Sequence, residues 1–232
     1  MKKQLFYLFS LLVVIATVSS CAKDDWDDDE NKVVYSVPAV DVNGAWYQSG
    51  AKLGGSSAYM GLHLNKAGNG HVMFYSKSAN KFAYYQINSS VDGEILTING
   101  CSAYEGNYLV ESVSSSSMKL RQGNYTQNYS KAMELTPANL ASRNYWGTST
   151  NSTTYWHYYF NSDNSGKLVY RNGSSSSAKT IGFTYSCSEE TGTLNIAYGN
   201  GTKENYEYAC ILNSTLLLIE RDGANVNCYV LQ

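Results

Sequence analysis

Apolar and polar residues alternate along most of the chain after residue 43. In the segment 58–64, Met60, Leu62 and Leu64 alternate with smaller or more polar residues, and the same period of two recurs in 154–160. This period places alternate side chains on opposite faces of a β-strand, whereas an amphipathic helix repeats its apolar residues three and four positions apart. Since no long helical period occurs, the pattern predicts an all-β protein.

Sixteen short strands are expected, eight in each half of the chain. The first eight begin near Trp46, Tyr59, His71, Phe82, Ile95, Tyr108, Met118 and Tyr129. The second eight begin near Trp146, Tyr155, Lys167, Ile181, Leu194, Tyr206, Leu216 and Val226. Turn sequences such as AGNG at 67–70 and DNSG at 163–166 separate the strands, and strands joined by short turns form an antiparallel meander.

The two halves also resemble each other in sequence. At a constant offset of 96 residues, 58–75 aligns with 154–171, with identical Tyr, Asn and Gly residues at matching places. The segments 107–120 and 205–218 match as well, and each opens with Asn-Tyr. Self-similarity of this kind indicates a duplicated structural unit.

The expected architecture is two tandem small antiparallel meander barrels of about eight strands each, because closure removes the exposed edges of a meander. The barrels would span 44–136 and 143–232, joined by the link PANLAS at 137–142. Strands of about seven residues that carry Trp, Tyr and Phe inward should fill their own interior. We therefore expect packed cores with little or no pocket.

Residues 1–20 predict export. Two lysines follow Met1, and an apolar run from Leu5 to Val18 leads to Ser19, Ser20 and Cys21. A basic start and roughly 7–15 apolar residues are typical of a secretory signal peptide. The stretch ending in Cys21 resembles the lipobox of bacterial lipoproteins, in which the signal is cut before a cysteine that becomes acylated. The resemblance implies lipidation of Cys21; the alternative is an ordinary signal peptide with a chance cysteine.

An acidic run follows the cysteine. Residues 24–30 hold six carboxylates in seven positions, and close like charges stay hydrated, so 21–43 is expected to be a flexible acidic tether. Such a run beside an acyl anchor resembles the export signal of surface lipoproteins in the Bacteroides group. The resemblance implies an outer-membrane, lipid-anchored protein that is exposed on the cell surface. A solvated spacer on a periplasm-facing lipoprotein is the alternative.

The opening of each repeat resembles a known fold family. GAW at 44–46 matches the G-x-W motif that opens lipocalins, and the second copy has YWG at 145–147. Both repeats therefore resemble the short lipocalin-like domains of Bacteroides lipoproteins. In lipocalins a late arginine packs on the tryptophan, and the resemblance assigns that cation–π contact to Arg121 and Arg221.

The charge balance and the absence of known motifs argue against several classes of function. From residue 44 onward, 13 Lys and Arg face 12 Asp and Glu, so no basic face for nucleic acid is expected. The three histidines lack metal-ligand spacing, and no nucleophile elbow, phosphate loop or paired acids appear. We expect a non-catalytic protein without metal or cofactor.

Four cysteines remain besides Cys21. By alternation Cys187, Cys210 and Cys228 would point into the second barrel from strands that are not neighbours, and Cys101 lies in the first repeat. We expect mostly buried free thiols, although a disulfide across the interior stays open.

The candidate ligand-binding residues lie on the outward faces of two equivalent strands. They are Tyr155, His157 and Tyr159 in the second repeat, and Tyr59 and His63 in the first. Exposed aromatic side chains can stack on sugar rings, and tyrosine adds a hydrogen-bonding tip. The leading prediction is a binding module for a glycan or host macromolecule. The alternatives are an accessory or structural subunit of an outer-membrane assembly, which would use the same face against a protein, and a lipocalin-type carrier of a small apolar ligand.

Overall fold

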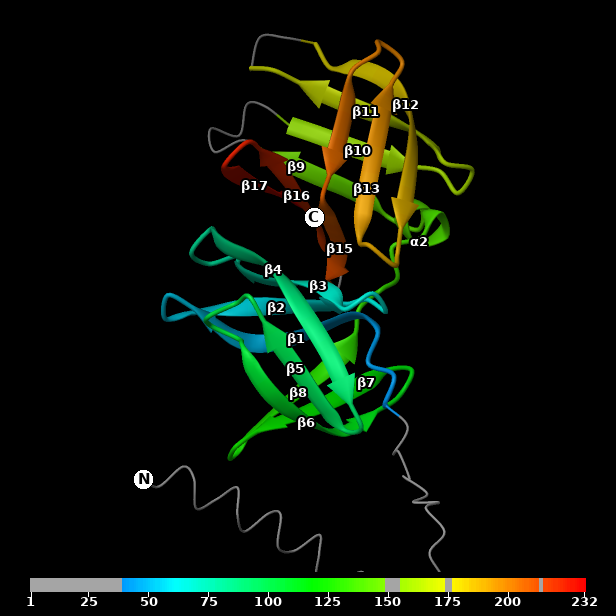
Figure 1. Ribbon diagram of the computed structural model, residues 1–232. Helices are drawn as coiled ribbons and strands as arrows, with labels where there is room; N and C mark the ends of the chain where they lie inside the picture. Colours follow the sequence, from blue (N-terminus) through cyan, green and yellow to red (C-terminus); the bar gives the residue numbers. More distant parts are fainter. Residues whose placement is uncertain (1–38, 149–154, 174–176, 213–214) are drawn as a thin grey trace, which may run out of the picture. The chain divides into compact units, whose positions relative to one another are not determined.

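The computed structural model describes residues 39–148, 155–173, 177–212 and 215–232, which form β-strands and one short helix (Figure 1). The prediction of an all-β protein is confirmed, and the strands begin within a few residues of their expected starts, except that two strands replace the one expected near Tyr206. The expected signal peptide, Cys21 and most of the expected tether lie outside the described residues.

The first eight strands form a closed antiparallel barrel. They are β1 Gly44–Leu53, β2 Ser56–Leu64, β3 Asn69–Ser76, β4 Lys81–Asp92, β5 Ile95–Asn99, β6 Gly106–Val113, β7 Ser117–Gln122 and β8 Tyr125–Lys131. Each strand pairs with the next, and β1 pairs with β8 where Trp46 lies opposite Lys131. This half of the chain has the predicted barrel.

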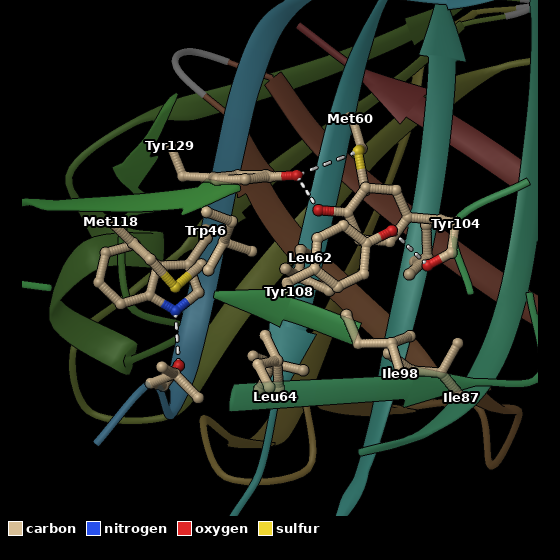
Figure 2. Close-up of a cluster of buried hydrophobic side chains, with 14 of the residues drawn as sticks. Trp46, Met60, Leu62, Leu64, Ile87, Ile98, Tyr104, Tyr108, Met118 and Tyr129 are labelled. Carbon is tan, nitrogen blue, oxygen red and sulfur yellow. Dashed lines mark hydrogen bonds between the residues drawn. The ribbon is translucent and has the colours of Figure 1, made fainter. Parts of the chain in front are cut away.

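Apolar side chains of this barrel pack together in its interior. Figure 2 shows Trp46, Leu62, Tyr108 and neighbouring apolar residues packed together between the strands. The indole Nε1 of Trp46 donates to the carbonyl of Val42 at 2.8 Å, and the hydroxyl of Tyr108 donates to the carbonyl of Tyr104 at 2.9 Å. The polar tips of the buried aromatic residues are thus paired inside the core.

The link between the halves is the short helix α2 Pro137–Ala141. Thr136 caps it by accepting a hydrogen bond from the backbone N–H of Asn139, and Pro137 takes the first helical position, where its missing N–H costs nothing. Leu140 is fully buried in the core of the second half, so the link is also part of that core.

The second half consists of two sheets. The strands are β9 Asn144–Thr148, β10 Tyr155–Phe160, β11 Ser165–Arg171, β12 Lys179–Ser188, β13 Thr193–Tyr198, β14 Lys203–Tyr206, β15 Tyr208–Leu212, β16 Thr215–Asp222 and β17 Asn225–Leu231. Strands β9 to β14 form a six-stranded sheet, and β15 to β17 form a three-stranded sheet. The prediction of a second closed barrel is therefore not confirmed, although both sheets contribute to one apolar core.

A break at Glu207 separates the two sheets. β14 ends at Tyr206 and pairs with β13, while β15 begins at Tyr208 and pairs with β16. In the first barrel the matching strand β6 has only a register shift between Val110 and Ser112 and stays paired on both sides. In the second half the equivalent strand is thus interrupted at one residue, and its two pieces belong to different sheets.

The far edges of the two sheets meet at the end of the chain. Trp146 of β9 and Gln232 exchange two backbone hydrogen bonds of 2.9 and 2.8 Å. Next to this contact, a methyl group on Gly147 would lie 2.7 Å from Leu231 Cδ2. The glycine that follows the tryptophan in this repeat therefore permits β9 and β17 to approach.

The break also corrects the predicted faces and the cysteine positions. Tyr206 points into the core of the second half, but Tyr208 and Cys210 do not, because skipping one residue turns the following side chains to the other face. They join Met73 in a separate cluster, against which Cys228 also packs. The prediction that Cys210 and Cys228 point into a second barrel is therefore wrong.

The thiols themselves are as expected. Cys101, Cys187, Cys210 and Cys228 are free; Cys101 and Cys210 are buried and the other two are half-buried. Burial raises the pKa of Cys210 and of Cys228 to about 12, so both remain protonated at neutral pH.

Truncation of the barrel core should be costly. Leu62 is fully buried in the core, and Leu62→Ala is expected to lower the free energy of unfolding by about 2–5 kcal/mol, because a cavity remains. The matched control is Tyr125→Ala, whose side chain is 80% exposed and whose effect should stay within about 0.5 kcal/mol. Urea unfolding followed by circular dichroism measures both, and equal midpoints for the two variants would contradict a packed interior.

Candidate functional site

The predicted residues of the second repeat lie on the outward face of β10. Tyr155, His157 and Tyr159 alternate with Trp156, Tyr158 and Phe160, and the latter three pack in the core. The prediction that the first three share a face pointing away from the core is confirmed. They form, together with Trp146, Lys167 and Arg171 of the adjacent strands, a surface that we call the β10 face.

Aromatic rings lie close together on this face. The ring centroids of Trp146 and His157 are 3.6 Å apart, those of His157 and Tyr159 are 3.9 Å apart, and those of Trp146 and Tyr155 are 6.0 Å apart. Trp146 is 48% exposed, whereas His157 is only 5% exposed beneath its neighbours. His157 therefore supports the other rings rather than meeting solvent itself.

Two cations cover the tyrosines of the β10 face. Lys167 Nζ lies 4.7 Å from the ring centroid of Tyr159, and the guanidinium carbon of Arg171 lies 5.6 Å from that of Tyr155. Both distances are within the range of cation–π contact. Burial and Lys167 hold the pKa of His157 below its ordinary value, so the imidazole is neutral at pH 7. The six side chains of the face thus combine aromatic rings with positive charge and include no carboxylate.

The predicted residues of the first repeat are not an equivalent site. Tyr59 is 38% exposed, but His63 is 2% exposed, and its Nε2 lies 3.0 Å from the carbonyl oxygen of Glu189. A methyl group on Gly61, between them on β2, would contact Leu212 and Cys210. Chain segments from the second half thus cover this face of the barrel, and the proposal of His63 as a ligand-binding residue is corrected.

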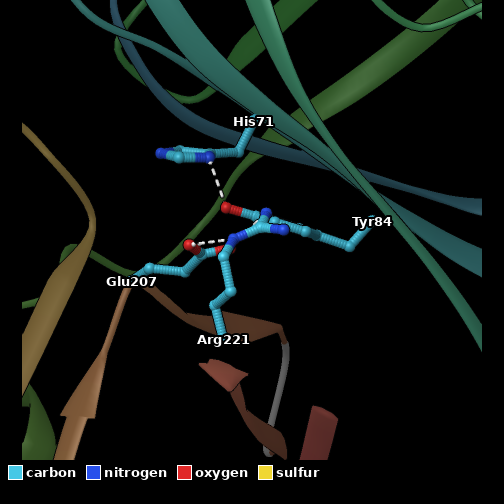
Figure 3. A network of polar contacts seen from close by, with 4 residues as sticks. All are labelled: His71, Tyr84, Glu207 and Arg221. Atoms are coloured by element: carbon cyan, nitrogen blue, oxygen red, sulfur yellow. Dashed lines mark hydrogen bonds and ion pairs between the residues drawn. The ribbon is translucent and has the colours of Figure 1, made fainter. Parts of the chain in front are cut away.

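Stacked rings fill this covered face. His71 stacks against both His63 and Tyr208, with ring centroids 5.8 and 4.6 Å away. Its Nδ1 lies 2.8 Å from the hydroxyl of Tyr84 (Figure 3). Burial and the neighbouring His63 lower the pKa of His71 to about 4, and burial also lowers that of His63. Both histidines are therefore neutral at pH 7.

The arginines that the lipocalin resemblance assigned to the tryptophans lie elsewhere. Arg121 pairs with Glu111 at 2.6 Å, and Arg221 forms two hydrogen bonds of 2.9 Å with the carboxylate of Glu207, also seen in Figure 3. The cation over Trp46 is Lys131, whose Nζ lies 4.4 Å from the ring centroid. The assignment of the cation–π contacts to the two arginines is thus wrong.

A pocket in the second half was not predicted. It has a volume of about 780 Å³ and is lined by both sheets of the second half together with Tyr75 and Asn80 of the first half. Its walls are Tyr75, Asn80, Trp146, Gly147, Trp156, Tyr158, Glu204, Tyr206, Leu218, Glu220, Cys228, Tyr229, Val230, Leu231 and Gln232. Little or no pocket is expected from the sequence, and this pocket contradicts that expectation. We call this space the Glu204 pocket.

Tyrosine hydroxyls fix the carboxylates of this pocket. Glu204 Oε2 accepts hydrogen bonds from Tyr198 at 2.7 Å, Tyr206 at 2.7 Å and Tyr158 at 3.4 Å. Burial raises the pKa of Tyr158 to about 12 and those of Tyr198 and Tyr206 further above the ordinary range, so these hydroxyls keep their protons. The only sequence signal was the position of Glu204, two residues before Tyr206 and hence on the same inward face.

No group of three or more His, Cys, Asp or Glu side chains among the described residues is placed to hold a metal ion. None of the helices in the described part of the chain is long and apolar enough to cross a membrane.

Comparison with known proteins returned no match to a family model, a curated protein or a solved structure. The function proposed for this chain is therefore argued from its own sequence and geometry.

The buried histidines should make stability depend on pH. The pKa of His71 is about 4 in the folded state and about 6.5 when unfolded, so below pH 6.5 the unfolded state binds more protons. Acidification from pH 6.5 to 4 should therefore lower the free energy of unfolding, with His71 contributing up to about 3 kcal/mol.

Chemical denaturation across this pH range checks the effect. His71→Gln cannot titrate, so the difference in unfolding free energy between wild type and variant should shrink as the pH falls. Because both proteins contain the same carboxylates, this difference isolates the histidine. A difference that stays constant from pH 7 to pH 4 would show that His71 is not held neutral by the fold.

Proposed function

We propose that the chain is a surface-tethered lipoprotein that binds a glycan through the β10 face and does not catalyse a reaction. The observation that carries this proposal is the combination of an exposed tryptophan and two partly exposed tyrosines, each tyrosine with a cation over its ring. The signal peptide, Cys21 and the acidic run support the anchoring part of the proposal.

The chemistry of the β10 face suits an acidic glycan. Flat aromatic rings stack on the apolar faces of sugars, and the tyrosine hydroxyls can exchange hydrogen bonds with sugar hydroxyls. Lys167 and Arg171 add positive charge beside the rings, and an arginine can bind a carboxylate or a sulfate through two parallel hydrogen bonds. A glycan bearing such groups would meet stacking and charge on the same surface.

The support beneath the face favours ordered binding. The six side chains stand on three neighbouring strands, which pair over most of their length, and the inward residues of β10 are locked in the core. Sites on strands hold their side chains more precisely than sites on loops. The ligand therefore meets rings that lose little freedom on binding.

A second candidate is an accessory subunit that uses the β10 face against a protein. The first repeat favours this candidate, because its equivalent face already packs against protein, namely Tyr208, Cys210 and Leu212. A lipocalin-type carrier of an apolar ligand has less support, since the first barrel is filled and the Glu204 pocket contains carboxylates.

Removal of the two tyrosines should weaken glycan binding. Each aromatic contact contributes about 1 kcal/mol beyond area burial, so Tyr155→Ala combined with Tyr159→Ala should weaken affinity at least about tenfold. A glycan array with sulfated, uronate-containing and neutral members identifies the ligand, and calorimetry measures the loss. Tyr125→Ala, an exposed tyrosine of the first barrel, is the matched control and should bind as the wild type. A glycan bound equally by the double variant would place the site elsewhere, and no glycan bound at all would favour the accessory-subunit candidate.

The anchor can be tested separately in cells. Cys21→Ser removes the sulfur that would be acylated, and the protein should move from the membrane fraction to the soluble fraction because the acyl chains provide the membrane affinity. Protease added to intact wild-type cells should digest the chain. Complete protection in intact cells, with digestion only after lysis, would contradict exposure on the surface.

A further inference from the structure

The Glu204 pocket has the composition of a binding site for a cation. Two of its lining side chains, Glu204 and Glu220, are carboxylates, and none of the fifteen lining residues is Lys, Arg or His. Lys77 reaches Gln232 at the rim, where its ammonium group donates to the amide oxygen at 2.8 Å, but it does not line the pocket. The walls therefore present negative charge to whatever enters.

Aromatic rings form much of the remaining wall. Tyr75, Trp156, Tyr158, Tyr206 and Tyr229 all line the pocket. The face of an aromatic ring attracts a cation through its quadrupole, and the attraction reaches about 2 kcal/mol or more where water is excluded. Rings and carboxylates in one pocket select for positive charge and against anions.

The carboxylates are held in place before a ligand arrives. Three tyrosine hydroxyls donate to the same oxygen of Glu204, and the hydroxyl of Tyr229 donates to Glu220 Oε2 at 2.8 Å. Fixed acceptors cost little ordering on binding, which increases affinity for a matching ligand. The volume of about 780 Å³ also falls within the usual range for small-molecule sites.

We infer that the Glu204 pocket binds a small organic cation, with the ammonium group near Glu204 and Glu220 and the carbon skeleton against the rings. This inference rests on groups other than those of the β10 face, because the two carboxylates come from β14 and β16, and of the six side chains of that face only Trp146 also lines the pocket. An apolar ligand would leave both carboxylates without a charge partner, and an anion would be repelled.

Matched pairs of cationic and neutral probes test the charge requirement. Calorimetry of the full chain in detergent solution would compare putrescine with 1,4-butanediol, and choline with 3,3-dimethyl-1-butanol, since each pair has nearly the same shape. At least one cation should bind at least about tenfold more tightly than its neutral counterpart, and its affinity should fall as salt rises. Equal affinities within both pairs, or no binding of either cation at about 10 mM, would overturn the inference.

Charge-removing variants locate the site. Glu204→Gln keeps the volume and still offers an oxygen to the tyrosine hydroxyls, so the fold should persist while cation affinity drops at least about tenfold. Glu220→Gln should weaken binding as well, and Glu94→Gln, an exposed residue in the turn after β4, should have no effect. Unchanged affinity in both the Glu204 and the Glu220 variant would overturn the inference.

Different variants test glycan binding at the β10 face and cation binding in the Glu204 pocket. The combined Tyr155→Ala and Tyr159→Ala variant should lose glycan binding and keep cation binding, whereas Glu204→Gln should do the reverse. Loss of cation binding in the tyrosine double variant with a folded protein, shown by an unchanged circular dichroism spectrum, would overturn the assignment of the cation to the Glu204 pocket.

Discussion

The break in strand pairing at Glu207 determines the architecture of the second half. Its carboxylate is held by two hydrogen bonds from Arg221, so the residue between β14 and β15 has a fixed partner outside the core. On either side of it, Tyr206 turns into the core and Tyr208 turns toward the first barrel. The consecutive strands β14 and β15 therefore contribute to two clusters: β14 lines the Glu204 pocket, and β15 covers β2 and β3.

The two repeats consequently differ in which faces they leave free. The outward face of β2 and β3 is buried by Tyr208, Cys210 and their neighbours, whereas the β10 face has no such cover among the described residues. Their interiors differ too. When the alignment of 107–120 with 205–218 is extended by one residue, Gly106 falls opposite Glu204, so the first repeat has a glycine where the second has a carboxylate. The first half is thus a closed barrel with a covered outward face, while the second half has the β10 face and contributes most of the walls of the Glu204 pocket.

Periodicity predicted the strands because period-two alternation and glycine-containing turns are local signals. It also predicted which β10 residues point outward, since alternation needs no knowledge of neighbours. It could not predict the break at Glu207, because the alternation of apolar residues continues through 206–212 without an interruption visible in the sequence. Because the break was not predicted, the positions of Cys210 and Cys228 were predicted wrongly. The pocket and the burial of His63 were not predicted either, because they depend on contacts between residues distant in the chain. The arginine assignments failed for a related reason, since Glu111 and Glu207 are closer partners than the tryptophans.

The open architecture and the carboxylate depend on each other. A carboxylate enclosed in a closed apolar barrel would lose its hydration, and such a group costs several kcal/mol unless it is fully paired. Three tyrosine hydroxyls satisfy one oxygen of Glu204, and the pocket leaves the side chain access to water or a ligand. Strand β14 is the edge of its sheet and pairs with β13 alone, which is consistent with Glu204 keeping that access. In the first repeat Gly106 imposes no such cost, and Tyr104, Gln127 and Tyr129 pair with one another inside a closed core. The repeat with glutamate at this position thus lines a pocket with a carboxylate, whereas the repeat with glycine is a closed barrel.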